Sequence, residues 1–104
     1  MPYSIVILES ASNQLAEIYK YIKYNLESPL AAINTIDKIE KAINDLNVFP
    51  NRFPLYKGKL KNKNKLRLMP LDNFNVYYSV NENDFYVYVH YIIYSKRNID
   101  NIID

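Results

Sequence analysis

The sequence predicts an α+β domain of two layers, in which an N-terminal helix hairpin packs on one face of an antiparallel sheet. Three patterns predict this class. A short β-branched run at residues 3–8 is followed by apolar residues at helical spacing over 11–47, and then by alternating apolar and polar residues over 65–94. Helices and a sheet in this order must bury their apolar sides against each other. The expected order of elements is β-α-α-β-β-β, in a single domain that spans residues 1–104.

The first strand and helix are predicted at residues 3–8 and 11–26. Residues 3–8 are mostly apolar and β-branched, as is typical of a strand. Ser10 and Ser12 supply side-chain oxygens that suit the start of a helix. The apolar stripe of this helix comprises Leu15, Ile18, Tyr19, Ile22 and Leu26. Because these residues recur every three or four positions, they share one helix face.

The second helix is predicted from Pro29 to Asn47. Ser28 and Pro29 separate the two helices, because proline disfavours helical geometry at the residue before it and suits the first position of a new helix. The apolar stripe comprises Ile33, Ile36, Ile39, Ile43 and Leu46. Phe49-Pro50 ends the helix. Since the link is short, the helices are expected to form an antiparallel hairpin.

Three further strands are predicted after a loop at residues 50–65. They cover residues 66–70, 74–80 and 85–94, and the short polar turns between them indicate an antiparallel meander. A short helical turn is expected over residues 98–103.

Alternation assigns the faces of these strands. One face of the last strand is predicted to carry Phe85, Val87, Val89, Tyr91 and Ile93. The other face is predicted to carry Tyr86, Tyr88, His90, Ile92 and Tyr94. The sheet face away from the helices is expected to be open and lined by Arg67, Asn75, Tyr77 and some of the last strand's tyrosines. An open face with aromatic and basic side chains suits RNA or an acidic protein segment.

Composition excludes several kinds of site. The chain has no cysteine and one histidine, so thiol nucleophiles, thiolate metal sites and multi-histidine metal sites are excluded. Gly58 is the single glycine, and one glycine cannot build a phosphate loop or a dinucleotide fingerprint. We therefore expect no metal and no cofactor. With no apolar run near the ~18 residues that span a membrane, and no signal peptide, a cytoplasmic protein without a membrane partner is expected.

The net charge of +2 conceals a strongly basic segment. Residues 56–70 contain six basic and no acidic residues, whereas the segments on both sides are mildly acidic. The basic residues are Lys57, Lys59, Lys61, Lys63, Lys65 and Arg67. A local positive field of this density favours an anionic partner, and a merely solvated basic loop is the alternative.

Several short motifs follow one another along the chain. They are Tyr21-Ile22, Ser28-Pro29-Leu30-Ala31-Ala32, Leu46 with Phe49-Pro50, Leu66-Arg67-Leu68-Met69-Pro70, Phe74-Asn75-Val76-Tyr77-Tyr78-Ser79-Val80 and Ile92-Ile93-Tyr94-Ser95-Lys96-Arg97. Their order and spacing resemble the RelE/ParE superfamily, the toxins of bacterial type II toxin–antitoxin systems, and the resemblance covers nearly the whole chain.

The resemblance implies one of two activities. ParE-like toxins arrest growth by inhibiting DNA gyrase and are not nucleases. RelE-like toxins are ribosome-dependent endoribonucleases, or mRNA interferases, so whether this chain is an enzyme stays open. The long hairpin, the Ser-Pro-Ala-Ala link and the Arg-x-x-Pro pattern of Arg67 to Pro70 favour the ParE-like branch. A degenerate member that only binds its partner or nucleic acid is a third interpretation. Every branch implies a cognate antitoxin and a toxin–antitoxin hetero-oligomer.

The resemblance also assigns site residues. Those expected to bind the target are Lys61, Lys63, Lys65, Arg67, Tyr77 and Arg97. If the protein is a nuclease, Arg67, Arg97 and Tyr94 are the expected catalytic residues, with Tyr77 or His90 as substitutes for a missing proton-transfer group. Two nuclease positions depart from the RelE pattern, because the third-strand arginine is Asn75 here and the C-terminal tyrosine falls at about Ile103.

Overall fold

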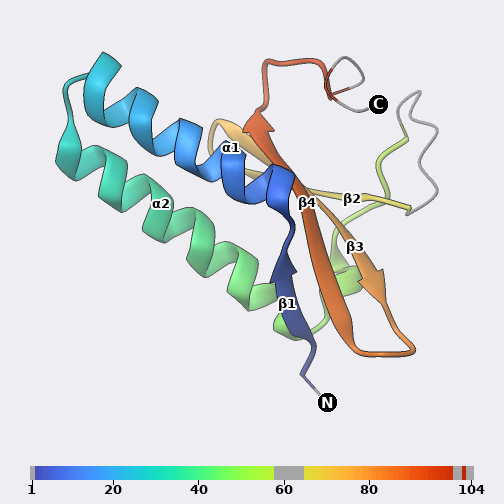
Figure 1. The fold of residues 1–104 in the computed structure, drawn as a ribbon. Helices are drawn as coiled ribbons and strands as arrows, with labels where there is room; N and C mark the ends of the chain where they lie inside the picture. The colour runs from blue at the N-terminus through green and yellow to red at the C-terminus, as the bar shows by residue number, and fades with distance from the viewer. Residues whose placement is uncertain (1, 58–64, 100–101, 103–104) are drawn as a thin grey trace.

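The computed structural model describes residues 2–57, 65–99 and 102. Its helices and strands are β1 (Ser4–Ile7), α1 (Glu9–Lys20), the π-helical turn η1 (Tyr21–Asn25), α2 (Pro29–Asn44), the 3-10 turns η2 (Asp45–Asn47) and η3 (Pro50–Arg52), β2 (Arg67–Leu71), β3 (Phe74–Asn81) and β4 (Tyr86–Tyr94). The α1–α2 hairpin lies on one face of the sheet, which confirms the predicted α+β class and element order (Figure 1). No helix of the described part of the chain is long and apolar enough to cross a membrane.

The sheet contains four strands in the order β1-β4-β3-β2. The pairs β2–β3 and β3–β4 are antiparallel, as the meander predicts. Strand β1 differs, because it pairs in parallel with β4, from Ser4 opposite Tyr86 to Ile7 opposite Val89. The sheet is therefore mixed rather than wholly antiparallel. The helix hairpin separates β1 from the meander, and a connection of that length lets a strand enter the sheet in parallel.

Helix α1 begins earlier than the sequence predicts. Strand β1 ends at Ile7, and the amide of Leu8 still donates to the carbonyl of Val89. The chain then turns directly into the helix, so Leu8 occupies the N-cap position and Ser10 lies inside the first turn. The prediction of Ser10 and Ser12 as caps is wrong for this reason. Helix α2 begins at Pro29, as predicted.

The main core lies between the hairpin and the sheet. Ile18 on α1 and Ile39 and Ile43 on α2 are buried, and they pack against residues of the sheet. The buried sheet residues of this core are Met69, Phe74, Val76, Tyr78, Val87, Val89 and Ile92. The two predicted stripes therefore supply the helix side of the core, but the prediction is wrong for Leu26 and Ile33, which are exposed.

A bulge in β4 reverses the faces of its second half. Tyr78 pairs with Val89 while Tyr77 pairs with Tyr91, so His90 is an extra residue in the ladder. Beyond the bulge, Ile92 packs in the main core, although strict alternation assigns it to the other face. The predicted faces of β4 are thus correct at Val87 and Val89 and wrong from Tyr91 to Tyr94.

The sheet face away from the hairpin is only half open. Tyr77 is 2% exposed and forms a second buried cluster with Leu66, Ile93 and Ile99. The loop residue Tyr56 covers this cluster, with its ring 5.4 Å from that of Tyr77. The expectation of a wholly open face is therefore wrong on the β2 side. The expected turn over residues 98–103 falls partly outside the described residues, and in the part described the amide of Ile102 donates to the carbonyl of Ile99.

Candidate partner-binding site

Arg67 supports the loop after α2 and does not line an open face. Its Nη1 donates to the carbonyl of Phe53 at 2.7 Å and to that of Asn51 at 3.2 Å. Arg67 stands opposite Tyr78 in the β2–β3 ladder, so it lies on the face opposite Tyr77. The expectation that Arg67 and Tyr77 share one binding surface is wrong. A charged donor that bonds two carbonyls across 14 and 16 residues fixes loop structure.

Two further side chains hold the same loop. The Nη1 of Arg52 donates to the carbonyl of Val48 at 2.8 Å and, at 3.3 Å each, to those of Asp45 and Phe49. The buried hydroxyl of Tyr78 donates to the carbonyl of Pro50 at 2.6 Å. Burial raises the pKa of Tyr78, against the opposing effect of the nearby arginines, which keeps the phenol protonated as a donor. We call the segment 48–53, held by these bonds, the clamped loop.

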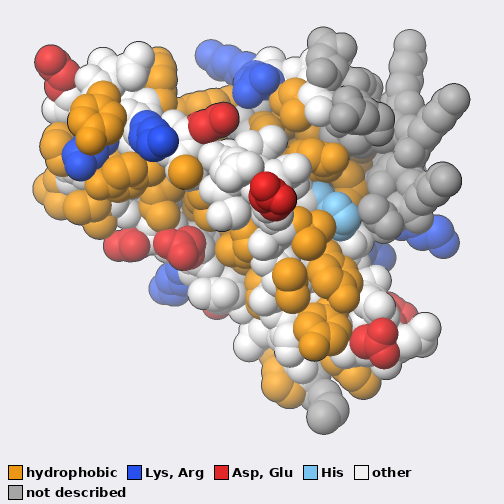
Figure 2. Space-filling model, in the orientation of Figure 1, with side chains coloured by type: hydrophobic (Ala, Val, Ile, Leu, Met, Phe, Trp, Pro, Cys, Tyr) orange, Lys and Arg blue, Asp and Glu red, His pale blue; other side chains and the backbone are white. Residues whose placement is uncertain are grey.

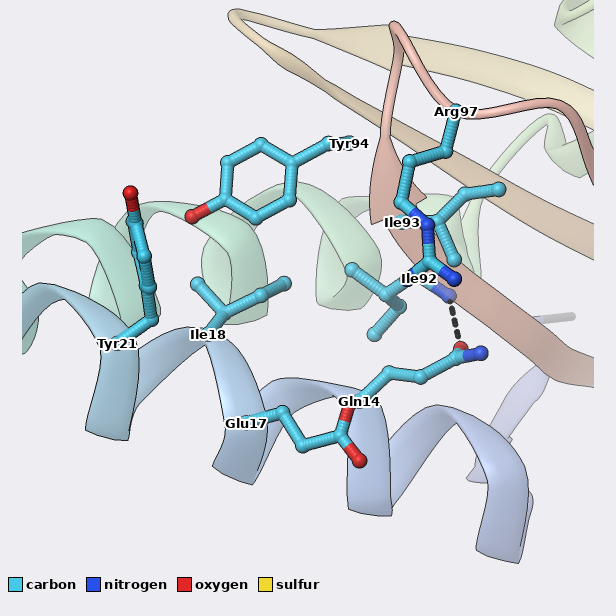
Figure 3. Close-up of a pocket in the computed structure, with 8 residues that line it drawn as sticks. All are labelled: Gln14, Glu17, Ile18, Tyr21, Ile92, Ile93, Tyr94 and Arg97. Atoms are coloured by element: carbon cyan, nitrogen blue, oxygen red, sulfur yellow. Dashed lines mark hydrogen bonds between the residues drawn. The ribbon is translucent and has the colours of Figure 1, made fainter.

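Tyr94 and Arg97 come together in a cleft between α1 and the end of β4. Tyr94 points toward Tyr21, and Arg97 points along the cleft toward Gln14 (Figure 3). The cleft has a volume of about 180 Å³ and is lined by Gln14, Glu17, Ile18, Tyr21, Ile92, Ile93, Tyr94 and Arg97. Its floor is fixed by a hydrogen bond of 2.7 Å from the Ile92 amide to Oε1 of Gln14. The structure therefore brings the predicted residues Tyr94 and Arg97 together in one cleft, whereas Arg67 does not line it.

The cleft suits a side chain better than a small molecule. Its volume of about 180 Å³ lies below the ~300–1,000 Å³ of typical ligand pockets. Burial, followed by the neighbouring Tyr21, raises the pKa of Tyr94. The Tyr94 phenol is therefore neutral near pH 7 and acts as a hydrogen-bond donor rather than as a base. An apolar floor with Arg97 and Glu17 on the walls fits an anchoring side chain of a protein partner.

The loop lysines are described only in part. Lys65 is exposed and adopts a left-handed backbone with φ of 50°. Lys61 and Lys63 lie outside the described residues, as do Gly58 and Ile103. Within the described residues, no group of three or more His, Asp or Glu side chains is placed to hold a metal ion.

The sequence does not reveal a Ser79–His90 contact on the open half of the sheet. The Oγ of Ser79 lies 2.8 Å from Nε2 of His90. Burial lowers the pKa of His90, so its imidazole is neutral at pH 7. Figure 2 shows the histidine beside hydrophobic side chains that cover β1 and β4. Strict alternation also puts Ser79 and His90 on this face, but Ser79 pairs with Tyr88 in the ladder and His90 is the extra residue of the β4 bulge, so alternation alone does not predict their contact.

The fold of this chain is similar to that of three solved structures of toxins or of toxin–antitoxin systems. A chromosomal ParDE toxin–antitoxin system from P. aeruginosa matches with a TM-score of 0.72 at 17% identity, covering 88% of this chain and 95% of that chain. The RelBE2 toxin–antitoxin complex from Mycobacterium tuberculosis matches with a TM-score of 0.62 at 15% identity, covering 90% of this chain and 99% of that chain. A free, doubly mutated RelE toxin from E. coli matches with a TM-score of 0.59 at 13% identity, covering 92% of this chain and 86% of that chain.

A match to a sequence family gives a narrower assignment than the similarity of fold. The model of the ParE toxin of type II toxin–antitoxin systems, parDE, matches residues 5–99. The chain belongs to this family. No curated protein matches the chain by sequence.

Proposed function

We propose that this protein is a ParE-like toxin that arrests growth in the cytoplasm by binding and inhibiting DNA gyrase. The family match over residues 5–99 is the observation that carries the proposal. The cleft of Tyr94 and Arg97 supports it, because its size and apolar floor suit an anchoring side chain of a large protein target.

The positions expected for a nuclease support the same choice. Cleavage of RNA by attack of a 2′-hydroxyl on the neighbouring phosphate needs a base, an acid and cations around that phosphate. Arg67 is bonded to loop carbonyls and Tyr77 is buried, so two of the expected residues do not face a common site. Tyr94 is a neutral phenol near pH 7. A cationic group without a positioned base stabilises charge but transfers no proton.

A cognate antitoxin completes the proposed system. The ParDE and RelBE2 structures are of toxin–antitoxin systems, and the basic segment 56–70 attracts an acidic partner. We expect a small antitoxin whose acidic, amphipathic segment binds this toxin in a hetero-oligomer. Co-expression of the antitoxin should abolish growth arrest.

The gyrase proposal is tested by supercoiling. Purified toxin should inhibit supercoiling by purified gyrase in a dose-dependent manner, and it should leave ribosome-bound mRNA intact in a translation reaction. Inhibition that is absent at a large molar excess of toxin, in a preparation that arrests growth when expressed, would refute gyrase as the target.

The RelE-like activity is the second candidate, because Arg97 and Tyr94 do line one cleft. A ribosome-dependent nuclease should cut mRNA only when ribosomes are present, and Arg97→Ala should abolish the cutting. Lys96→Gln is the matched control for this variant, because Lys96 is the basic residue next to Arg97 in the sequence. Arg52→Gln does not serve as a control, because Arg52 holds the clamped loop. A protein that binds nucleic acid with steep salt dependence and shows no toxicity would instead be a degenerate member.

A further inference from the structure

The clamped loop presents Phe49 to solvent in an unfavourable backbone conformation. The Phe49 side chain is 83% exposed, the largest fraction among the exposed large hydrophobic residues of the described chain. Its φ of 47° and ψ of 53° lie in the left-handed region. A bulky residue with a Cβ seldom adopts this region, which favours glycine and asparagine. The chain thus holds an aromatic ring in water where glycine would be less strained.

Side-chain hydrogen bonds hold the backbone on both sides of this residue. Arg52, Arg67 and Tyr78 together donate six hydrogen bonds to carbonyls between Asp45 and Phe53, one of them the carbonyl of Phe49 itself. Arg52 lies within this loop, whereas Arg67 and Tyr78 come from β2 and β3, so two strands distant in sequence also hold it. A conformation that is both strained and held from several sides is typical of a functional site. A backbone that is already fixed also loses little entropy when the side chain it carries enters a partner's pocket.

The surroundings of Phe49 define the chemistry of its partner. An open hollow of about 790 Å³ lies beside it and is lined by Pro2, Tyr3, Val48, Phe49, Pro50, Asn51 and Arg52. The lining is mainly apolar, and Arg52 is its one charged side chain among the described residues. The segment lies next to β1 at the end of the molecule that carries the N-terminus, away from the α1–α2 link (Figure 1). Its partner should therefore offer an apolar pocket with a carboxylate near the rim.

We propose that Phe49 is the anchor by which this toxin docks on its protein target, inserting into an apolar pocket whose acidic rim faces Arg52. This inference rests on the proposed function, since it assumes that the toxin acts by binding a protein. It adds a second contact to the cleft of Tyr94 and Arg97. Binding energy concentrates in such buried aromatic anchors, so loss of Phe49 should weaken inhibition by about ten-fold or more.

The test is the variant Phe49→Gly, which separates docking from stability. Glycine suits the left-handed backbone, so the melting temperature should stay the same or rise. The concentration for half-maximal inhibition of gyrase supercoiling should rise by about ten-fold. Glu27→Gly is the matched control, because Glu27 is also exposed with a φ of 50° but lies in the α1–α2 link. Phe49→Asn provides a second variant compatible with the same backbone.

The outcomes separate this inference from the proposed function. If Phe49→Gly inhibits gyrase as strongly as the wild type, the docking role is wrong and the gyrase proposal stands. If the wild type does not inhibit gyrase, the gyrase proposal is wrong, and growth arrest on induced expression becomes the readout for Phe49. Full arrest by Phe49→Gly then overturns the docking role, and weakened arrest with an unchanged melting temperature supports it. A wild type that causes no arrest overturns both.

Discussion

The hydroxyl of Tyr78 is expected to stabilise the clamped loop, and Tyr78→Phe removes that hydroxyl alone. Tyr78 is fully buried, and its hydroxyl donates to the carbonyl of the buried Pro50 at 2.6 Å. Phenylalanine keeps the ring in the core, so packing changes little. The variant loses one hydrogen bond and leaves a buried acceptor unpaired, which together cost about 2 kcal/mol. For a domain of this size, that loss lowers the melting temperature by roughly 8–16 °C.

The measurement is chemical and thermal unfolding followed by far-ultraviolet circular dichroism. The free energy of unfolding of Tyr78→Phe should fall by about 2 kcal/mol with an unchanged denaturant slope. Tyr24→Phe is the matched control, because Tyr24 is 64% exposed and its hydroxyl contributes little. A loss below about 0.5 kcal/mol for Tyr78→Phe, the range of ordinary surface changes, would show that the bond to Pro50 does not hold the loop.

Three further substitutions test other parts of the structure. Arg67→Ala should destabilise the fold by about 1–2 kcal/mol, because two carbonyls lose a charged donor; a stable variant that loses only toxicity would instead restore Arg67 as a target-binding residue. Because burial holds the pKa of His90 below the 6.5 of the unfolded chain, the folded state binds fewer protons, and wild-type stability should fall as pH drops below about 6.5. His90→Gln should lack that part of the pH dependence in urea titrations at pH 7.5 and 5.5. Lys38→Met breaks the exposed 2.7 Å ion pair with Asp72 and should change stability by less than about 1 kcal/mol, an effect that high salt should erase.

The helix hairpin and the order of helices and strands along the chain can largely be predicted from the sequence. Isoleucines at positions such as Ile18, Ile39 and Ile43 have helical spacing and are buried in the structure. Pro29 begins α2, as its fixed φ predicts. These features are local, since each depends on residues within a few positions along the chain. The parallel entry of β1 is not local, because it depends on where the hairpin returns the chain to the sheet.

The candidate site is less readable, because it depends on register. The extra residue at His90 moves Ile92 into the main core and Ile93 to the other face, and no residue type in this strand marks the bulge. Arg67 and Arg97 look alike in sequence, as basic residues beside strands. The structure assigns them different surroundings, since Arg67 bonds loop carbonyls and Arg97 lines a cleft.

Phe49 shows how a departure from local preference points to function. The left-handed backbone costs a residue with a Cβ roughly 1–2 kcal/mol relative to the right-handed form, and an exposed ring returns almost nothing through burial. Arg52, Arg67 and Tyr78 stabilise the loop enough to offset that cost. The three donors would support a glycine at position 49 equally well, because they bond backbone carbonyls and not the ring. Fold stability therefore explains the donors but not the phenylalanine, and the aromatic side chain gains its value only in contact with another molecule.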